Sequence, residues 1–189
     1  GGGQGNVHKI QEIETGKIYA AKIINNIDES ELRSTLINLS REVNNLARMN
    51  HPSILQFKGF SPFGFQNEAT PVIVTEFSSG GSLKNILVLE KKNKAPEKWD
   101  DTQKLITLYG IASGMAYLHK NKIIHRDLKP ANILEDENLF PCICDFGLSK
   151  NLHSNDESVT AQSQSAAKGT YFYMAPEVWR MYDYSESCD

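Results

Sequence analysis

The stretch His125–Leu134, with the sequence HRDLKPANIL, decides how the rest of this chain is interpreted. It places a carboxylate, a cation and an amide in one short loop, on Asp127, Lys129 and Asn132. Phosphoryl transfer uses such groups: the carboxylate accepts the proton of the attacking hydroxyl, the cation offsets charge on the transferred group, and the amide oxygen binds a metal ion. The loop therefore predicts a phosphoryl-transfer site.

A second motif points to the same chemistry. Asp145 opens the tripeptide DFG, 18 residues after Asp127 and directly after the apolar run PCIC. A second carboxylate at this place can hold a divalent metal ion against the phosphates. The tripeptide alone occurs by chance in many proteins, but chance does not explain both motifs in this order and at this distance.

The composition is that of a folded globular protein. Of the 189 residues, 40% are hydrophobic and 23% are charged, and the net charge is −3. A nucleic-acid surface usually requires a basic patch, which this balance does not suggest. The longest apolar runs are too short to span a bilayer. We therefore expect no nucleic-acid partner and no membrane segment in these residues.

The cysteines indicate an intracellular protein. There are three, Cys142, Cys144 and Cys188, and their odd number and spacing fit neither a disulfide framework nor a metal site. We interpret them as reduced thiols, and we predict a cytoplasmic location.

The first third of the chain has the pattern of strands and one helix. Residues 7–24 hold two alternating apolar runs around ETGK, with Gly16 at the turn of a predicted hairpin. Helical periodicity follows over residues 28–49 and ends before Pro52. Residues 54–60 and 71–77 are two further predicted strands.

After the SSGGS segment the pattern becomes mainly helical. One helix begins after Ser82 as its N-cap, and a longer one covers residues 101–121, with Asp100 and Gln103 as a capping box. Short strands are expected beside both motifs, and residues 148–168 are polar and serine-rich, which indicates a mobile segment. The predicted buried stripe of the long helix consists of Leu105, Leu108, Ala112, Met115 and Leu118.

Together the two motifs resemble those of eukaryotic protein kinase catalytic domains, and the resemblance extends over essentially all 189 residues. It implies an α+β, bilobal kinase fold in truncated form. Residues 1–77 correspond to an N-lobe with a small antiparallel sheet and one regulatory helix, lacking its first strand. Residues 78–189 correspond to a mainly helical C-lobe that ends at the start of its central helix, with Asp189 where the family has an aspartate buried beneath the catalytic loop.

The resemblance also assigns the glycine-rich start, which taken alone fits a flexible linker as well. Gly2, Gly5 and Val7 fall on the last three fixed positions of the kinase pattern G-x-G-x-x-G-x-V, and Lys22 in YAAKII follows Val7 by the family's 15 residues. In the family this lysine holds the α- and β-phosphates of ATP, and a helix glutamate, here Glu42, positions it. ATP and Mg²⁺ are the implied cofactors.

The remaining site residues follow from the same resemblance. The segment from Glu76 to Ser78 corresponds to the hinge that offers backbone groups to adenine, with Thr75 as the gatekeeper. The implied catalytic residues are Asp127, Lys129, Asn132, Lys22 and Glu42, and the implied metal ligands are Asn132 and Asp145. The implied nucleotide-binding residues are Gly2, Gly5, Val7, Ala20, Lys22, Thr75, Glu76, Phe77, Ser78, Leu134 and Asp145.

Two features concern the hydroxyl that is phosphorylated. Lys129, two residues after the base, and Thr170 are typical of serine/threonine kinases, whereas YMAPEVW and the hinge look like those of tyrosine kinases. This mixture is typical of the tyrosine-kinase-like group, whose members mostly modify serine and threonine. A tyrosine or dual-specificity kinase and a nucleotide-binding pseudokinase scaffold remain the alternatives.

Arg126 beside the base suggests control by phosphorylation, because a phosphate adds negative charge that an arginine can meet. The implied partners are protein substrates and, for residues 149–165, an activating kinase or the enzyme itself. The alternative is a serine-rich loop that nothing modifies. The candidate phosphate acceptors are Ser154, Ser158, Thr160, Ser163 and Ser165.

We expect residues 1–189 alone to be poorly active.

Overall fold

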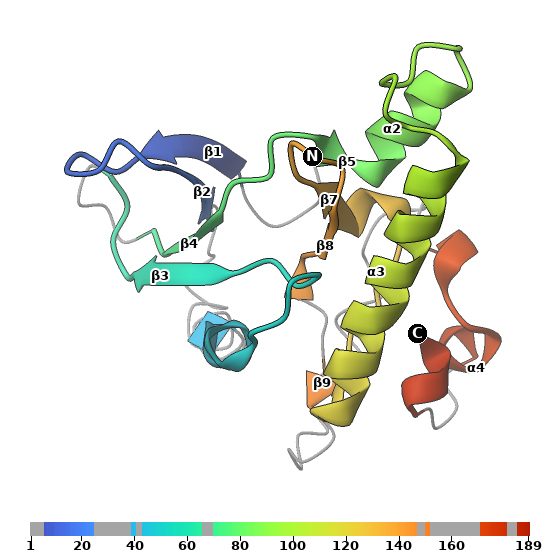
Figure 1. The fold of residues 1–189 in the computed structure, drawn as a ribbon. Coiled ribbons are helices and arrows are strands. Elements are labelled where there is room, and N and C mark those ends of the chain that lie inside the picture. Colours follow the sequence, from blue (N-terminus) through green and yellow to red (C-terminus); the bar gives the residue numbers. More distant parts are fainter. Residues whose placement is uncertain are drawn as a thin grey trace. The chain divides into compact units, whose positions relative to one another are not determined.

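The structure is a computed structural model that describes residues 6–24, 39–40, 43–65, 70–146, 150–151, 171–180 and 185–189. The chain divides into two compact units (Figure 1). Gly1–Asn50 and Leu55–Phe77 form the first unit, and His51–Ile54 and Ser78–Asp189 form the second.

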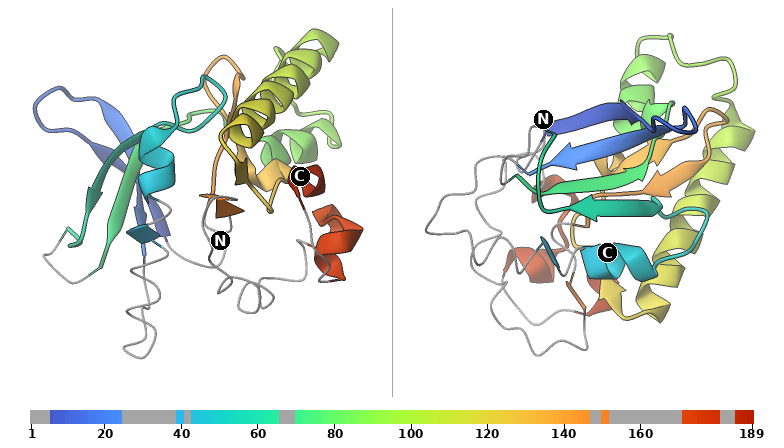
Figure 2. Two further views of the ribbon diagram at one scale, coloured as in Figure 1. Left: turned by 90° about the horizontal axis from the view of Figure 1, so that it is seen from below. Right: turned by 90° about the vertical axis from the view of Figure 1, so that its left-hand side faces the viewer.

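The first unit contains a four-stranded antiparallel sheet in the order β1-β2-β4-β3, seen face-on in Figure 2 (right). The strands are β1 (Asn6–Gln11), β2 (Ile18–Ile23), β3 (Phe57–Ser61) and β4 (Val72–Glu76). The predicted β1–β2 hairpin is confirmed. Gly16 has φ +71°, a backbone conformation that glycine adopts without steric cost. Its N–H donates to the Glu12 carbonyl at 2.9 Å.

The predicted helix over 28–49 is described only in part. Residues 39–40 and 43–48 are helical, with Leu39 and Leu46 buried. The predicted strand 54–60 was placed too early, since β3 begins at Phe57. Ile54 instead forms an isolated parallel bridge with Ile143 inside the second unit, where it is fully buried.

The second unit is built on two helices, α2 (Leu83–Glu90) and α3 (Asp101–Lys120). Ser82 caps α2 as predicted, and its side chain accepts from Asn85 N at 3.3 Å. For α3 only half of the predicted capping box forms. Asp100 Oδ1 accepts from Gln103 N at 2.8 Å, but Gln103 Nε2 donates to the Leu139 carbonyl at 2.7 Å and so ties the helix to a loop beyond it.

Helix α3 packs closely against β8, the edge strand of a three-stranded sheet with the order β5-β7-β8. The strands are β5 (Gly81–Ser82), β7 (Ile133–Glu135) and β8 (Pro141–Ile143). Because β8 is an edge strand, it can contain Pro141, which has no N–H to donate. Glycines permit the approach of the helix: a Cβ on Gly110 would lie 2.5 Å from Pro141 Cγ, and one on Gly114 2.8 Å from Ile143 Cδ1.

The predicted apolar stripe of α3 is right only in its second half. Met115 and Leu118 are buried, but Leu105 and Leu108 are 67% and 64% exposed. The face against the sheet carries Gly110 and Gly114, so it is marked by small residues that a search for leucines passes over.

Short elements complete the second unit. β6 (Ile123–Ile124) pairs with β9 (Lys150–Asn151), and the 3₁₀ helix η1 (Pro130–Asn132) leads into β7. Tyr171–Tyr173 (η5), Pro176–Trp179 (α4) and Glu186–Cys188 (η6) follow. The predicted α+β class is confirmed. In the described part of the chain, no helix is long and apolar enough to cross a membrane.

Candidate active site

Asp127 is a buried carboxylate whose two oxygens have different surroundings. The residue is 7% exposed. Its Oδ2 accepts from Lys129 Nζ at 2.6 Å and from Asn132 Nδ2 at 2.8 Å. Its Oδ1 has no hydrogen-bond partner among the described residues. One oxygen is thus held in place, and the other is buried with its lone pairs unused by the described residues.

The loop is closed on itself by local contacts. Asn132 Nδ2 also donates to the backbone carbonyl of Asp127 at 2.8 Å, and Asn132 N donates to the Lys129 carbonyl at 2.9 Å. Pro130 begins the 3₁₀ turn that brings Asn132 back towards Asp127, a position where its missing N–H costs nothing. The sequence KPAN therefore sets the relative position of the three polar side chains.

The second motif is bonded to this loop. Cys144 N donates to the Asn132 carbonyl at 2.9 Å, and the His125 and Phe146 rings lie 5.1 Å apart. These contacts bring the backbone just before Asp145 to that of Asn132. Asp145 itself is exposed, so its carboxylate can meet a ligand from solvent.

His125 bonds to both motifs, a role that its sequence position alone did not predict. Its Nδ1 accepts from Asp127 N at 3.3 Å, and its Nε2 lies 3.0 Å from the Cys144 carbonyl. Because a carbonyl only accepts, Nε2 carries the proton and the ring is neutral. Burial lowers the pKa of His125, against the carbonyl and nearby carboxylates that favour the charged form. The only sequence feature that could have indicated this role is the position of His125 directly before Arg126 and Asp127.

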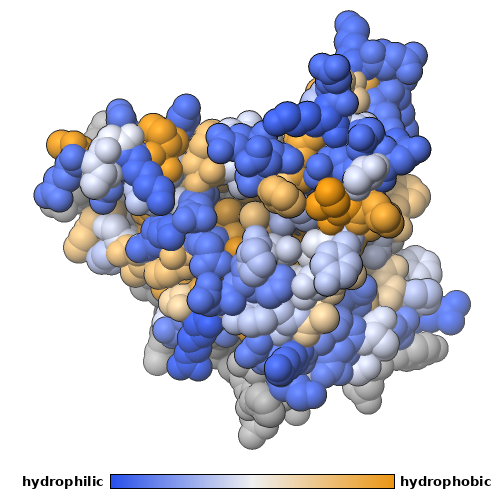
Figure 3. All heavy atoms as spheres, viewed as in Figure 1, coloured by the Kyte–Doolittle hydropathy of each residue, from blue (hydrophilic) through white to orange (hydrophobic). Residues whose placement is uncertain are grey.

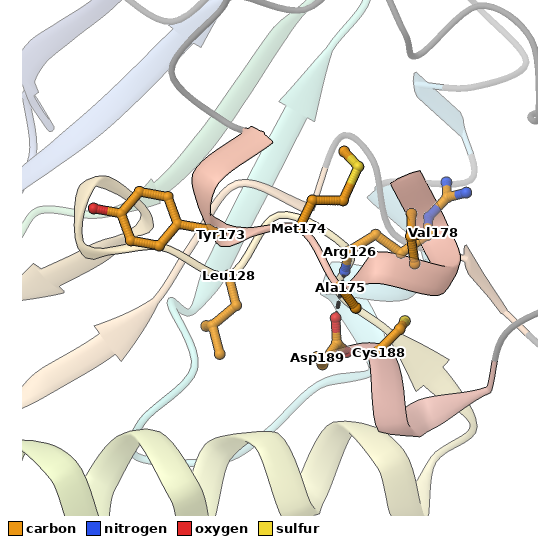
Figure 4. Close-up of a pocket in the computed structure, with 8 residues that line it drawn as sticks. All are labelled: Arg126, Leu128, Tyr173, Met174, Ala175, Val178, Cys188 and Asp189. Atoms are coloured by element: carbon orange, nitrogen blue, oxygen red, sulfur yellow. Dashed lines mark hydrogen bonds between the residues drawn. The ribbon is translucent and has the colours of Figure 1, made fainter. Parts of the chain in front are cut away.

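Asp189 lies under the catalytic loop, as predicted. Its Oδ2 accepts from His125 N at 2.7 Å and lies 3.0 Å from His119 Nε2. Its Oδ1 accepts from Arg126 N, the bond dashed in Figure 4. A cavity of about 60 Å³ opens beside this bond, and burial raises the pKa of the Cys188 thiol in its wall to about 11. The cavity lining consists of Arg126, Leu128, Tyr173, Met174, Ala175, Val178, Cys188 and Asp189.

In the first unit, four predicted nucleotide-binding residues share one face of the sheet. Val7 is paired with Lys22, and Ala20 is paired with Thr75. Paired residues of antiparallel strands point to the same side, and so do residues two apart on β2. Glu76 points to the other side, where it forms an ion pair with Lys58 at 2.9 Å, so its nucleotide contact would be through the backbone.

The other predicted nucleotide-binding residues make few specific contacts among the described residues. Phe77 is 39% exposed with Lys9 Nζ 5.1 Å from its ring centre, and Ser78 follows as the first residue of the second unit's main segment. Leu134 is half-buried on β7, on the face opposite Ile133 and Glu135. Gly2, Gly5, Glu42, Thr170 and residues 152–165 lie outside the described residues.

A metal site built from the described residues would draw on few protein ligands. Among the described residues, no group of three or more His, Cys, Asp or Glu is arranged to hold a metal ion. Asn132 and Asp145 fit the other kind of site, in which one or two side chains and substrate phosphates share an Mg²⁺ ion.

Comparison with known proteins agrees with this geometry. A family model described as protein kinase domain matches residues 1–189. The chain belongs to the protein kinase family. The predicted α+β, bilobal kinase fold is thereby confirmed, and membership implies ATP and a divalent metal ion in general.

Individual kinases match over the whole chain. A probable serine/threonine-protein kinase of Dictyostelium discoideum is 35% identical over 190 residues, which cover 100% of this chain and 19% of the relative. The receptor-like kinase LIP1 and the serine/threonine-protein kinase CTR1 of Arabidopsis thaliana are 34% and 36% identical, with 28% and 21% of their lengths covered. The chain therefore spans about a fifth to under a third of these relatives.

Proposed function

We propose that the protein containing this chain is an ATP-dependent serine/threonine kinase that transfers the γ-phosphoryl group to protein hydroxyls. The observation that carries the proposal is the asymmetry of Asp127. Lys129 and Asn132 fix Oδ2, and Oδ1 has no partner within the described residues. A buried, oriented carboxylate oxygen with a free lone pair suits a general base for a hydroxyl.

In this proposal Asp127 accepts the proton of the acceptor hydroxyl. The hydroxyl oxygen bonds to the γ-phosphorus as the bond to the bridging oxygen of ADP breaks. Lys129 lies 2.6 Å from Oδ2, close enough to offset charge on the transferred group as well as to hold the base. Asn132 keeps Asp127 in one orientation through its two Nδ2 bonds.

Asn132 and Asp145 are the proposed Mg²⁺ ligands. The Asn132 amide nitrogen bonds to Asp127, which leaves the amide oxygen as its metal-binding atom. An Mg²⁺ ion between these residues would neutralise charge on the β- and γ-phosphates. The bond from Cys144 N to the Asn132 carbonyl holds the two ligands in register.

The nucleotide-binding residues are proposed residue by residue, from the family's pattern. Lys22, with Glu42 as its positioning partner, would pair with the α- and β-phosphates, and the backbone of Gly2 and Gly5 would contact the phosphates as well. Val7, Ala20 and Thr75 share the sheet face that bears Lys22 and so suit the adenine side. The remaining proposed contacts are the backbone of Glu76, Phe77 and Ser78 and the side chain of Leu134.

Serine and threonine are the proposed acceptors. Lys129 bonded to the base supports this, and two of the relatives bear serine/threonine-protein kinase names. Substrates are proteins, and phosphorylation within residues 149–165, by another kinase or by the enzyme itself, is proposed to act through Arg126. A tyrosine or dual-specificity kinase and a pseudokinase scaffold are the alternatives. The cytoplasmic location remains a prediction.

The test uses the full-length protein with ATP and Mg²⁺. A generic serine/threonine substrate and a tyrosine polymer are offered in parallel, and nucleotide binding is measured separately. Labelling of the first substrate, lost in Asp127→Asn, supports the proposal. Labelling of the polymer supports the tyrosine alternative, and ATP binding without any transfer supports the scaffold.

A further inference from the structure

Glu135 is a buried acid that the proposed reaction does not use. It is the last residue of β7, three residues after Asn132, and it is 0% exposed. Neither Oε1 nor Oε2 has a hydrogen-bond partner among the described residues. An ionised carboxylate without partners is very costly inside a protein, so this environment favours the neutral acid.

The position of Glu135 within the sheet explains its burial. Residues two apart on a strand share a face, so Glu135 lies on the side of Ile133. Its cross-strand partner is Pro141, and that of Ile133 is Ile143. Helix α3 covers Pro141 and Ile143 at its glycines, so Glu135 belongs to the layer between α3 and the sheet.

A second unsatisfied group lies in the same layer. Thr107 is 2% exposed, and its Oγ1 also has no partner among the described residues. It lies on the face of α3 that carries Gly110 and Gly114, because positions three and seven residues apart are on one side of a helix. The layer thus holds an acid and a hydroxyl but no cation from the described chain to stabilise an ionised form.

The charged groups on the elements around β7 do not compensate Glu135. In the described chain, Lys104 of α3 is paired with Glu90 of α2 at 2.6 Å, and Lys84 of α2 is exposed. β5 and β8 carry no acid or base apart from the Cys142 thiol, which lies on the opposite face of β8. Asp136 follows β7 directly. Burial, and secondarily the charge of Asp136, raises the pKa of Glu135 to about 8.

We propose that Glu135 is a neutral acid in the folded second unit, and that its ionisation loosens β7 beneath α3, which makes the unit a pH-sensitive switch. β7 continues directly from η1, which carries Asn132. Loosening of β7 therefore reaches the catalytic loop. That last step rests on the proposed kinase function, whereas the switch in stability does not.

The direction of the effect follows from proton binding. The folded state holds a proton that an unfolded glutamate releases above its ordinary pKa of about 4.5. Raising the pH between about 5 and 8 therefore favours the open state by about tenfold per pH unit, and the effect levels off above the folded pKa.

The first test is hydrogen–deuterium exchange in the full-length protein, read in peptides that cover β7 and β8 and corrected for intrinsic rates. The ratio of opening constants, wild type over Glu135→Gln, should rise about tenfold per pH unit from about pH 5 to 8. Glu137→Gln, which removes an exposed acid from the next turn, should behave as wild type. Equal pH dependence of wild type and Glu135→Gln would overturn the proposal.

A second measurement needs no folded variant. The infrared spectrum of the wild-type protein with isotope-labelled glutamate should contain a protonated-carboxyl band at pH 6.5 that disappears by pH 9.5. Where Glu135→Gln or Glu135→Leu folds, the band should be missing. A wild type that has no such band at pH 6.5 rules the proposal out. Both measurements are independent of catalysis, so their failure is distinguishable from failure of the kinase assignment.

Discussion

Asp189 holds the backbone of Arg126: its Oδ1 accepts a hydrogen bond from Arg126 N at 2.6 Å. The Asp189 side chain is only 1% exposed. Arg126 has φ +66°, a left-handed conformation that costs a non-glycine residue about 1–2 kcal/mol. The bond supports this conformation, and Arg126 directly precedes Asp127. The orientation of the proposed base therefore depends on a carboxylate 62 residues away in sequence.

Replacement of this carboxylate should loosen the catalytic loop. Asp189→Ala leaves the N–H groups of His125 and Arg126 without their acceptor. At about 1–3 kcal/mol for each buried donor, the loss of stability should be about 2–6 kcal/mol. Chemical unfolding of the full-length protein measures it. Glu186→Ala, which removes an exposed ion pair with Lys122, should cost under about 1 kcal/mol. Similar costs for the two variants would contradict the inferred role of Asp189.

The base and the metal ligand should have separable effects. Asp127→Asn should lower turnover about 100- to 10,000-fold and leave ATP binding intact, because Asp127 acts on the acceptor hydroxyl. Asp145→Asn should instead weaken Mg²⁺-dependent ATP binding. Calorimetric titration of ATP with and without Mg²⁺, beside turnover measurements, distinguishes the two. Wild-type turnover in Asp127→Asn would remove the proposed mechanism.

Loss of Lys22 should slow phosphoryl transfer more than loss of Glu42, because only Lys22 is proposed to contact the phosphates directly. Lys22→Met removes the cation that would meet the phosphates and should abolish transfer. Glu42→Gln only alters the positioning of Lys22 and should slow transfer less. Steady-state rates of the two variants give the ranking. An equal loss in both would show that positioning matters as much as the charge itself.

The geometry of the loop around Asp127 could be predicted because its contacts are local. KPAN sets the positions of Lys129 and Asn132 around Asp127 over a few residues, so the motif and the geometry coincide. The contacts that support it are not local. His125 reaches the Cys144 carbonyl and Gln103 reaches the Leu139 carbonyl, and no periodicity in the sequence indicates a side chain bonded to a distant backbone group.

The fold elements were predicted best where capping or turn residues mark them. Gly16 and Ser82 each mark a turn or helix start that the structure confirms. The buried face of α3 was predicted poorly. Leucine spacing indicates a helix but not which side meets the sheet, and here the close approach at Gly110 and Gly114 determines that side.

That close approach is itself testable. In Gly110→Ala the new Cβ would lie 2.5 Å from Pro141 Cγ, and the proline ring cannot rotate away. Overpacking of this kind costs about 1–3 kcal/mol, which outweighs the gain of about 1 kcal/mol from replacing a helical glycine with alanine. Gly59→Ala is the control, since nothing lies within 4 Å of its Cβ. Thermal melts in which Gly110→Ala is as stable as wild type would show that the helix can shift away.

The exposed leucines of α3 predict how residues 1–189 behave when produced alone. Leu105, Leu108 and Tyr109 are 67%, 64% and 77% exposed, and a hydrophobic patch lies over this helix in Figure 3. Each leucine left in water forgoes about 1.5–3 kcal/mol of burial. Because a domain is stable by only about 5–15 kcal/mol, the piece should be marginal, poorly active and inclined to aggregate.

A fluorescent dye that binds apolar surfaces measures this patch. Residues 1–189 should bind it strongly, and the double change Leu105→Glu and Leu108→Glu should remove most of the signal, since both residues are about two-thirds exposed and little packing is lost. The matched change Val88→Glu and Leu89→Glu on α2, where the side chains are 43% and 38% exposed, should remove less. A cooperative melt without dye binding, from a piece that phosphorylates substrate normally, would mean that the sheet and the Asp189 contacts suffice to hold the catalytic loop.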